Sequence, residues 1–316
     1  MRAVILDTDS LGPRVDFAPL TDCYDNIEFL NVADKAQTIQ AVKSAEVIIS
    51  NKVVIDREVI EGAPSLKRIQ VAATGYNNVD LQTCHERGIG VCNVRAYGTA
   101  SVSQHTWALI LALSNRVIEH HQQSINGQWS ESPWFCTFDH RVNELEGKVL
   151  TIIGGGELGS AVGKIAEAFG MRVQFAGRKH TGAQTGRVPF NQAISTADVI
   201  TLHCPLNADT ANLISTPEFK LMKPSSLLVN TARGGIVDEA ALIEALQNAQ
   251  IAGAAFDVLT TEPPSSDHPL LQNIPNLIIT PHVAWASIEA RQRIIDQMAD
   301  IERHADYINH NYINAL

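Results

Sequence analysis

The chain has 316 residues, of which 45% are hydrophobic and 18% are charged, and its formal net charge at pH 7 is −10. This composition is typical of a soluble globular protein, and the length allows two domains with cores of their own. An acidic chain without a basic stripe argues against binding to nucleic acid or to an anionic membrane, so we expect a small-molecule enzyme or a protein-binding module.

The five cysteines are scattered, and none of them belongs to a C-x-x-C pair. We therefore expect neither a disulfide framework nor a metal site. The first residues enter a strand-like run directly, without a signal peptide, and no apolar run is long enough to cross a membrane. These features predict a cytoplasmic protein.

Strand-like runs alternate with helical patterns through the first hundred residues. The strand-like runs are residues 3–6, 27–30, 47–50, 69–72 and 89–92, and the helical patterns are 34–44, 57–62 and 80–87. This alternation predicts a parallel sheet with crossover helices. The chain changes character near Tyr97-Gly98-Thr99, where an apolar helix over 102–118 begins, and we place the first domain boundary there.

The segment 126–139 is rich in aromatic residues and contains Pro133, which favours an extended arm over a regular element. Its aromatic residues include Trp129, Trp134, Phe135 and Phe138. Because exposed aromatic side chains usually bind a partner surface, we predict a homodimer built around this arm and the preceding helix.

A strand-like run over 149–153 leads into glycines and then into a helical pattern. Gly154, Gly156 and Gly159 match G-x-G-x-x-G in the strand, turn and helix context that the motif requires. The backbone N–H groups at the helix start, around Glu157 and Leu158, would meet the phosphates of a dinucleotide. The alternative is an ordinary glycine turn.

A second series of strands follows, at 173–176, 199–202, 227–229, 253–256 and 277–279. A helix over 239–248 has Asp238 as its expected N-cap, and the last stretch, 288–312, is predicted to be a long amphipathic helix. Two similar αβ halves predict two doubly wound domains with parallel sheets and a ligand cleft between them.

Three polar residues near strand ends form a candidate catalytic set, namely Arg233, Glu262 and His282. Reduction of a 2-keto acid needs a proton donor for the carbonyl oxygen, and an imidazole beside a carboxylate can supply that proton near neutral pH. A guanidinium binds a carboxylate with two parallel hydrogen bonds and can polarise the adjacent keto oxygen. Taken singly, each residue has another interpretation. Glu262 before Pro263 is typical of a solvated loop charge, and His282 after Pro281 is typical of a turn residue.

Five segments resemble the D-isomer-specific 2-hydroxyacid dehydrogenases, and the resemblance extends over nearly the whole chain. They are the glycine turn, His203-Cys204-Pro205-Leu206, Asn230-Thr231-Ala232-Arg233-Gly234-Gly235, Phe256-Asp257-Val258 before Glu262-Pro263, and Thr280-Pro281-His282. The resemblance implies that Arg233 binds and polarises the substrate, that Glu262 pairs with His282, and that His282 is the acid/base.

The resemblance also implies further binding residues. Cofactor contacts are expected from the glycine turn, Arg233 and His282, and from Cys204, Pro205, Thr231, Ala232, Asp257 and Ala284. The segment 73–80 is the implied substrate loop, in which the Thr74 and Gly75 amides would hold the carboxylate, and Trp285 is a further implied substrate contact. Lys52, after an earlier strand, is expected to face the same pocket, with a surface lysine as the alternative.

Within the family the chain is similar to glycerate dehydrogenases, also called hydroxypyruvate reductases, in three segments, 71–75, 134–139 and 281–287. This similarity implies hydroxypyruvate or glyoxylate as the oxidised substrate. The family also implies that the last helix returns to the first domain. The expected domains are then a substrate domain of 1–98 with 286–316, and a Rossmann-like NAD(P)-binding domain of 99–285.

One segment departs from the NAD-preferring pattern, in which the second strand of the nucleotide domain ends in an acidic residue that holds the ribose. Here the strand ends in Phe175-Ala176-Gly177-Arg178-Lys179. Arg178 and Lys179 would pair with a 2′-phosphate that a carboxylate would repel, which favours NADP(H) over NAD(H). The alternative is that both are solvated loop charges.

Two other functions fit the same motifs. One is a non-catalytic dinucleotide sensor of the corepressor type, and the other is a dehydrogenase of this fold for another substrate, such as formate or phosphite. The intact set of Arg233, Glu262 and His282 favours an enzyme over the sensor.

Overall fold

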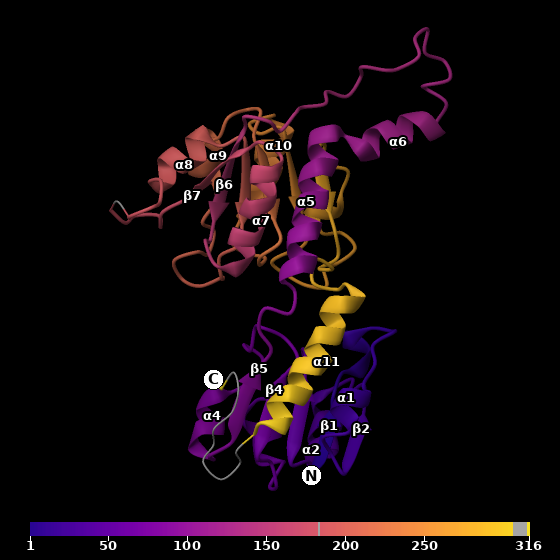
Figure 1. Ribbon diagram of the computed structural model, residues 1–316, viewed down its shortest axis with the longest axis vertical. Coiled ribbons are helices and arrows are strands. Elements are labelled where there is room, and N and C mark those ends of the chain that lie inside the picture. The colour runs from indigo at the N-terminus through magenta and orange to yellow at the C-terminus, as the bar shows by residue number, and fades with distance from the viewer. Residues whose placement is uncertain (183, 306–314) are drawn as a thin grey trace. The chain divides into compact units, whose positions relative to one another are not determined.

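The computed structural model describes residues 1–182, 184–305 and 315–316, which form two compact units (Figure 1). Unit 1 consists of Met1–Gly98 and Ala286–Leu316, and unit 2 of Thr99–Trp285. Within the described residues, no helix combines the length and the apolar character needed to cross a membrane.

Unit 1 is built on a five-stranded parallel sheet with the strand order β2-β1-β3-β4-β5. Its strands are β1 (Arg2–Ile5), β2 (Asn26–Phe29), β3 (Val47–Ser50), β4 (Arg68–Val71) and β5 (Gly90–Asn93). Its helices are η1 (Thr8–Leu11), α1 (Ala18–Thr21), α2 (Lys35–Val42), α3 (Arg57–Glu61), α4 (Leu81–Glu86) and α11 (Ile288–Arg303).

Strand β4 shows how both faces of this sheet are covered. Ile69 and Val71 belong to the apolar core that the sheet shares with helices α2 to α4. The alternate residues Arg68 and Gln70 point to the other face, where both contact Glu302 of α11. Because side chains alternate along a strand, one strand serves an apolar face and a buried polar face at once. Helix α11 ends at Arg303, and the rest of the helix predicted up to residue 312 lies largely outside the described residues.

Unit 2 contains a six-stranded parallel sheet with the order β11-β10-β9-β8-β6-β7. Its strands are β6 (Val149–Ile153), β7 (Arg172–Phe175), β8 (Val199–Leu202), β9 (Leu227–Asn230), β10 (Gly253–Phe256) and β11 (Leu277–Ile279). Its helices are α5 (Thr99–Asn115), α6 (Val117–Ile125), α7 (Glu157–Ala168), α8 (Phe190–Thr196), α9 (Thr216–Leu221), α10 (Glu239–Gln247) and η2 (Pro269–Leu271).

Helices cover both faces of the unit 2 sheet. Helices α5 and α7 lie side by side on one face (Figure 1) and share a core with β6 that includes Trp107, Ile110 and Val162. Helices α8, α9 and α10 form the core of the other face. The strand order reverses at β6, which has β8 on one side and β7 on the other. The predicted class of two parallel, doubly wound αβ sheets is therefore confirmed.

The helix predicted over 102–118 is wrong at its end. Helix α5 stops at Asn115, because Arg116 takes a left-handed conformation with φ of 52°, and α6 follows in a new direction. The segment after α6 then reaches away from the sheet of unit 2 (Figure 1). The apolar run continues through Val117 and Ile118, so composition alone does not mark the break.

Candidate active site

The glycine turn after β6 has the backbone geometry that the motif predicts. Gly154 has φ of 104°, a left-handed region that side chains rarely adopt, and a Cβ there would lie 2.4 Å from the carbonyl carbon of His203. A Cβ on Gly159 would lie 2.1 Å from the oxygen of Gly154, so α7 packs onto the turn at a distance only glycine allows. Gly156 is the N-cap of α7, and a Cβ there would meet nothing within 4 Å.

A pocket of about 900 Å³ lies against this turn. It is lined by Gly154 and Gly155, by the chain after β7 including Arg178, and by Cys204-Pro205 with the loop that follows. Pockets of several hundred Å³ accommodate ligands of cofactor size. The open approach to Gly156 at the N-terminus of α7 suits a pyrophosphate. The residues present therefore fit a dinucleotide.

His203 and Cys204, which lie against the glycine turn, carry no charge at neutral pH. Burial lowers the pKa of His203 to about 4, and its Nε2 lies 2.9 Å from the Thr201 hydroxyl. Burial also raises the pKa of the Cys204 thiol. The backbone N–H groups and the helix terminus are thus left to bind the phosphates.

Glu262 and His282 are brought together by two neighbouring strands. Glu262 lies in the loop after β10, and His282 lies in the loop after β11, which pairs with β10 in the sheet. The His282 Nδ1 is 2.6 Å from Oε2 of Glu262, and each side chain is one-third exposed. The imidazole is therefore held by a carboxylate while part of it still reaches solvent.

The Glu262 carboxylate is held in its ionised form. Burial raises the pKa of this carboxylate, but the hydrogen bonds from His282 and from the Leu259 N–H lower it by a larger amount. The pKa therefore lies below its ordinary value. A charged carboxylate that accepts from Nδ1 holds the ring in one orientation, with Nε2 as the nitrogen that remains for proton transfer.

Arg233 reaches the same edge of the sheet from β9. Its guanidinium is exposed and donates to the neighbouring Ala232 carbonyl, with an Nη1 to oxygen distance of 2.7 Å. The following residue, Gly234, packs so closely that a Cβ would lie 1.8 Å from the oxygen of Leu259. The turn that carries Arg233 therefore lies against the loop that carries Glu262. In the described residues, Arg233 makes no direct hydrogen bond to Glu262 or His282.

Asp257, at the end of β10, organises the loop that carries His282. One carboxylate oxygen accepts from the Thr280 hydroxyl and the Val283 N–H, and the other accepts from the Ala284 N–H. The His282 N–H donates to the Asp257 carbonyl at 2.9 Å. Burial raises the pKa of Asp257, but hydrogen bonds, first of all from His105, lower it below the ordinary value. This carboxylate, predicted to bind cofactor, is therefore already engaged by protein groups.

Other predicted cofactor and substrate residues of unit 2 lie on these loops or in the first turn of α7. The Thr231 hydroxyl is buried, 2.9 Å from that of Thr106, and Ala232 donates its N–H to the Asn230 side chain. Ala284 is buried, and Trp285 next to it is half-buried. Glu157 accepts a hydrogen bond from the Thr99 hydroxyl at 2.6 Å, and Leu158 follows it in the first turn of α7.

The predicted substrate residues of unit 1 lie on adjoining loops of its sheet. Lys52 follows β3, and its backbone N–H donates to the Asp7 carboxylate. Thr74 and Gly75 follow β4, which pairs with β3. The Asn78 side chain joins the two loops by donating to the Val53 carbonyl at 2.9 Å. The structure thus brings Lys52 and the predicted substrate loop to one edge of the sheet.

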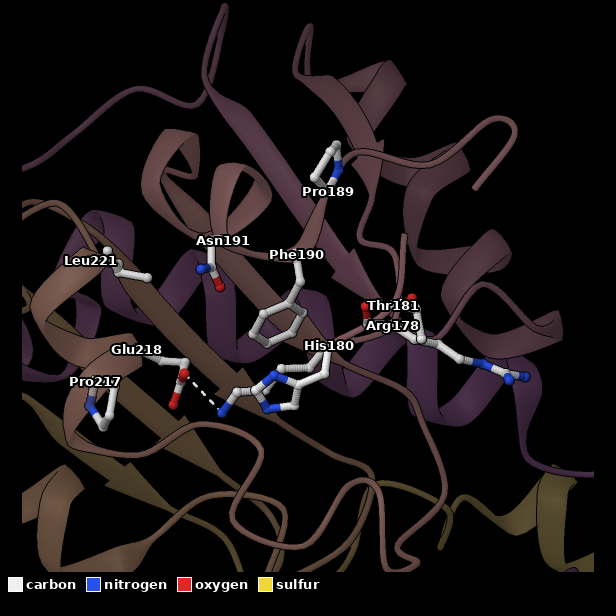
Figure 2. Close-up of a pocket in the computed structure, with 10 residues that line it drawn as sticks. Arg178, His180, Thr181, Pro189, Phe190, Asn191, Pro217, Glu218 and Leu221 are labelled. Carbon is white, nitrogen blue, oxygen red and sulfur yellow. Dashed lines mark hydrogen bonds and ion pairs between the residues drawn. The ribbon is translucent and has the colours of Figure 1, made fainter. Parts of the chain in front are cut away.

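Arg178 and Lys179 follow β7 but differ in their surroundings. The Lys179 ammonium lies 2.8 Å from Oε1 of Glu218, and that contact is the dashed line in Figure 2. Arg178 extends away from Glu218 in the same view. Of the two cations, Lys179 is thus paired within the fold, at the edge of a second hollow of about 490 Å³.

Three polar residues near these sites, Arg187, His105 and Asp7, are absent from the sequence expectations. Arg187 lines the pocket at the glycine turn, and the His105 Nε2 lies 3.0 Å from the Thr280 hydroxyl. Neither follows a predicted strand or belongs to a motif, so no local signal marks them. Asp7 directly follows the first predicted strand, and that position is a signal that points to it.

Comparison with known proteins agrees with this geometry. The family model described as D-isomer specific 2-hydroxyacid dehydrogenase, NAD binding domain, matches residues 107–284. The chain is 40% identical over 300 residues to a glycerate dehydrogenase of Methylorubrum extorquens, covering 95% of this chain and 94% of the relative. It is 37% identical over 303 residues to a hydroxypyruvate reductase of Blautia hydrogenotrophica, covering 94% of each.

Among solved structures, the chain is similar to an acyclic imino acid reductase in complex with NADPH and D-Arg. The TM-score is 0.86 at 26% sequence identity, and the match covers 100% of both chains. The dinucleotide-binding turn, the Glu262 and His282 pair and these relationships lead to one conclusion: the chain belongs to the D-isomer specific 2-hydroxyacid dehydrogenase family.

Proposed function

We propose that this enzyme reduces hydroxypyruvate or glyoxylate, giving D-glycerate or glycolate, and that it prefers NADP(H) to NAD(H). The observation that carries the reaction is the 2.6 Å contact between His282 and Glu262, on the same sheet as a dinucleotide-type glycine turn. The substrate class is supported by the names of the relatives, a glycerate dehydrogenase and a hydroxypyruvate reductase.

When bound, the reduced cofactor supplies the hydride for the keto carbon. His282, with its Nδ1 on the Glu262 carboxylate, delivers the proton to the keto oxygen from Nε2 and later recovers one from solvent. Arg233 binds the substrate carboxylate and stabilises the negative charge that develops on the keto oxygen. Asp257 keeps the 280–284 loop in place throughout.

Other residues retain their proposed roles in binding. Lys52, Thr74 and Gly75 of unit 1 and Trp285 of unit 2 are proposed substrate-binding residues. The preference for NADP(H) is supported by the end of β7, where Ala176-Gly177-Arg178 replaces the acidic residue that would hold a ribose hydroxyl. The complex of the imino acid reductase with NADPH shows that a relative of this fold binds the phosphorylated cofactor.

The reaction is tested by following NADPH absorbance with a panel of 2-keto acids, and then with NADH. We expect hydroxypyruvate and glyoxylate to be consumed, with a higher kcat/KM for NADPH. His282→Gln should lower kcat by about 10²- to 10⁴-fold, because it removes the proton donor, while NADPH still binds as measured by fluorescence titration. Unchanged turnover in this variant would refute the assignment. Tight NADPH binding with no turnover of any 2-keto acid would instead favour the dinucleotide sensor.

We also propose a cytoplasmic homodimer in which the arm after α6 contacts a second copy. Phe135 and Phe138 are 91% and 85% exposed in the single chain, and Trp134 is 71% exposed. Exposed apolar side chains that cluster on one segment are typical of a protein–protein interaction surface. All five cysteines are free thiols, which suits a reducing compartment.

The assembly is tested by sedimentation of the wild type and of the double variant Phe135→Ser, Phe138→Ser. We expect a dimer mass for the wild type and a shift towards monomer for the variant. A monomer mass at every concentration would refute the dimer.

A further inference from the structure

We propose that Arg187, together with Arg178, selects the cofactor by binding its 2′-phosphate, and that Lys179 instead stabilises the fold. This assignment rests on the preference for NADP(H) proposed above and names the residues that produce it. None of the sequence motifs includes Arg187, and its position is visible only in the tertiary structure.

The relevant part of the pocket is the carboxyl end of β7, because a dinucleotide on this fold places its adenine ribose there. Beyond β7, the chain pairs again with the end of this strand at Val188. There Val188 donates its N–H to the Phe175 carbonyl at 2.9 Å, and the Gly177 N–H donates to the Val188 carbonyl at 2.8 Å. This short parallel pairing holds the residue before Val188 beside the end of β7.

The guanidinium of Arg187 is placed over the glycine turn. Its Nη1 donates to the Ala176 carbonyl at 3.3 Å. Its Nη2 lies 2.9 Å from the position that a Cβ of Gly155 would occupy. Arg187 thus lies between the end of β7 and the turn that meets the pyrophosphate, where the ribose 2′ position is expected.

The positive charges of Arg178 and Arg187 also support a site for the 2′-phosphate. Arg178 and Arg187 both line the pocket of about 900 Å³. In the described part of the chain, neither guanidinium forms an ion pair with a carboxylate. Both can therefore donate hydrogen bonds to a phosphate. Two planar guanidinium groups suit a dianionic phosphate because each can donate two parallel hydrogen bonds.

Lys179 does not have this freedom. Its ammonium pairs with Glu218, whose side chain is 3% exposed, and also donates to the Leu213 carbonyl at 3.3 Å. The second oxygen of Glu218 accepts from the Ser215 N–H in the capping box of α9. Moving Lys179 to a phosphate would leave a buried carboxylate without its cation, which is costly. Figure 2 shows the Glu218 contact on the side away from Arg178.

The test is equilibrium binding to the full chain of two probes that differ only in the 2′-phosphate, namely 2′,5′-ADP and 5′-AMP. We expect Arg187→Gln to weaken the binding of 2′,5′-ADP by about tenfold or more, because a charge-assisted hydrogen bond is lost. The binding of 5′-AMP should weaken by less than about twofold. Arg172→Gln, an exposed arginine at the start of β7, is the matched control and should change neither. Lys179→Gln should lower Tm and leave the ratio of the two affinities unchanged.

Titration with NADPH and NADH separates the remaining outcomes. An equal loss of both affinities in Arg187→Gln would overturn the proposal, because it would place the guanidinium on the pyrophosphate or in the fold. Loss of the 2′-phosphate preference in Lys179→Gln would overturn it as well. If the wild type binds 2′,5′-ADP no better than 5′-AMP, the proposal and the preference for NADP(H) both fail. Turnover of hydroxypyruvate with NADH would show in that case that the dehydrogenase function stands.

Discussion

A buried carboxylate determines the backbone geometry around His282, the proposed proton donor. His282 has φ of 52°, a left-handed conformation that costs free energy in a residue with a side chain. Asp257 offsets this cost by accepting hydrogen bonds on both sides of His282, from Thr280 and from Val283 and Ala284. The proposed catalytic histidine is thus positioned by a buried carboxylate that is hydrogen-bonded to the residues around it.

Asp257→Asn should lower the free energy of unfolding by about 1.5–3 kcal/mol at neutral pH, because buried hydrogen bonds to a charged acceptor are lost. The pKa of Asp257 in the folded protein lies below the ordinary value of 3.8. Its stabilisation is therefore complete above about pH 4 and is lost as the pH falls through the lower, folded-state pKa. In thermal unfolding, the Tm difference from the wild type should be constant between about pH 5 and 8 and should narrow below about pH 4.

The exposed Glu244 of α10 provides a control, and Glu244→Gln should leave Tm nearly unchanged at every pH. A Tm difference for Asp257→Asn that stays constant down to the acid limit of the native fold would contradict this account of Asp257.

At the scale of elements, the contact between β6 and α7 assigns a different task to each glycine of the turn. Gly159 lies where α7 contacts β6. A Cβ on Gly159 would lie 2.9 Å from the Ile152 side chain and 2.1 Å from the Gly154 oxygen. Gly156 faces open space at the N-cap. Gly159 therefore serves packing, and Gly156 leaves room for the approach of the proposed cofactor.

The two roles separate on substitution by alanine. Gly159→Ala should destabilise the protein by about 1–3 kcal/mol, because α7 must shift to avoid the overlap. It should also weaken cofactor binding. Gly156→Ala should lower the free energy of unfolding by less than about 1 kcal/mol. It should still weaken the binding of NADPH, because the new methyl group occupies the approach of the pyrophosphate. Chemical denaturation and fluorescence titration measure the two effects, and equal destabilisation by both variants would be inconsistent with the packing described.

At the scale of the whole molecule, the chain leaves unit 1 at Gly98 and returns to it at Ala286. The return is anchored by α11 through a buried polar network. Arg68 of β4 is fully buried against Glu302, which also accepts from the Tyr24 hydroxyl at 2.8 Å and from the Gln70 side chain at 3.0 Å. Two segments far apart in the sequence therefore share one ion pair.

Glu302→Leu should lower the free energy of unfolding by about 3–5 kcal/mol, because it leaves the Arg68 charge buried without its carboxylate. The double variant Arg68→Met, Glu302→Leu should recover much of that loss, since no buried charge remains. Denaturant unfolding of both variants measures the difference. Arg57→Ala, which removes an exposed ion pair with Glu86, should leave the free energy of unfolding nearly unchanged. No recovery in the double variant would argue against an electrostatic origin.

The sequence by itself determined the elements and the family. Every predicted strand is present, shifted by at most one residue at an end, because short apolar runs bounded by turn residues are a local signal. Asp238 caps α10 as expected, accepting from the Ala240 and Ala241 N–H groups. Arg233, Glu262 and His282, the proposed catalytic set, could be selected from the sequence because strand ends and motifs mark their positions along the chain.

Only the tertiary structure decided which charges meet. The partners of Arg68, Lys179 and Asp257 lie on other elements, and local patterns carry no signal for contacts between distant segments. The break at Arg116 and the short helices α8 and α9 were missed, since an apolar run continues across the break and six or seven residues hold too little periodicity. Arg187 reaches the end of β7 only because the chain folds back at Val188 to add a short pairing to the sheet edge. Composition and motif describe what a segment prefers, whereas packing decides which side chains share a site.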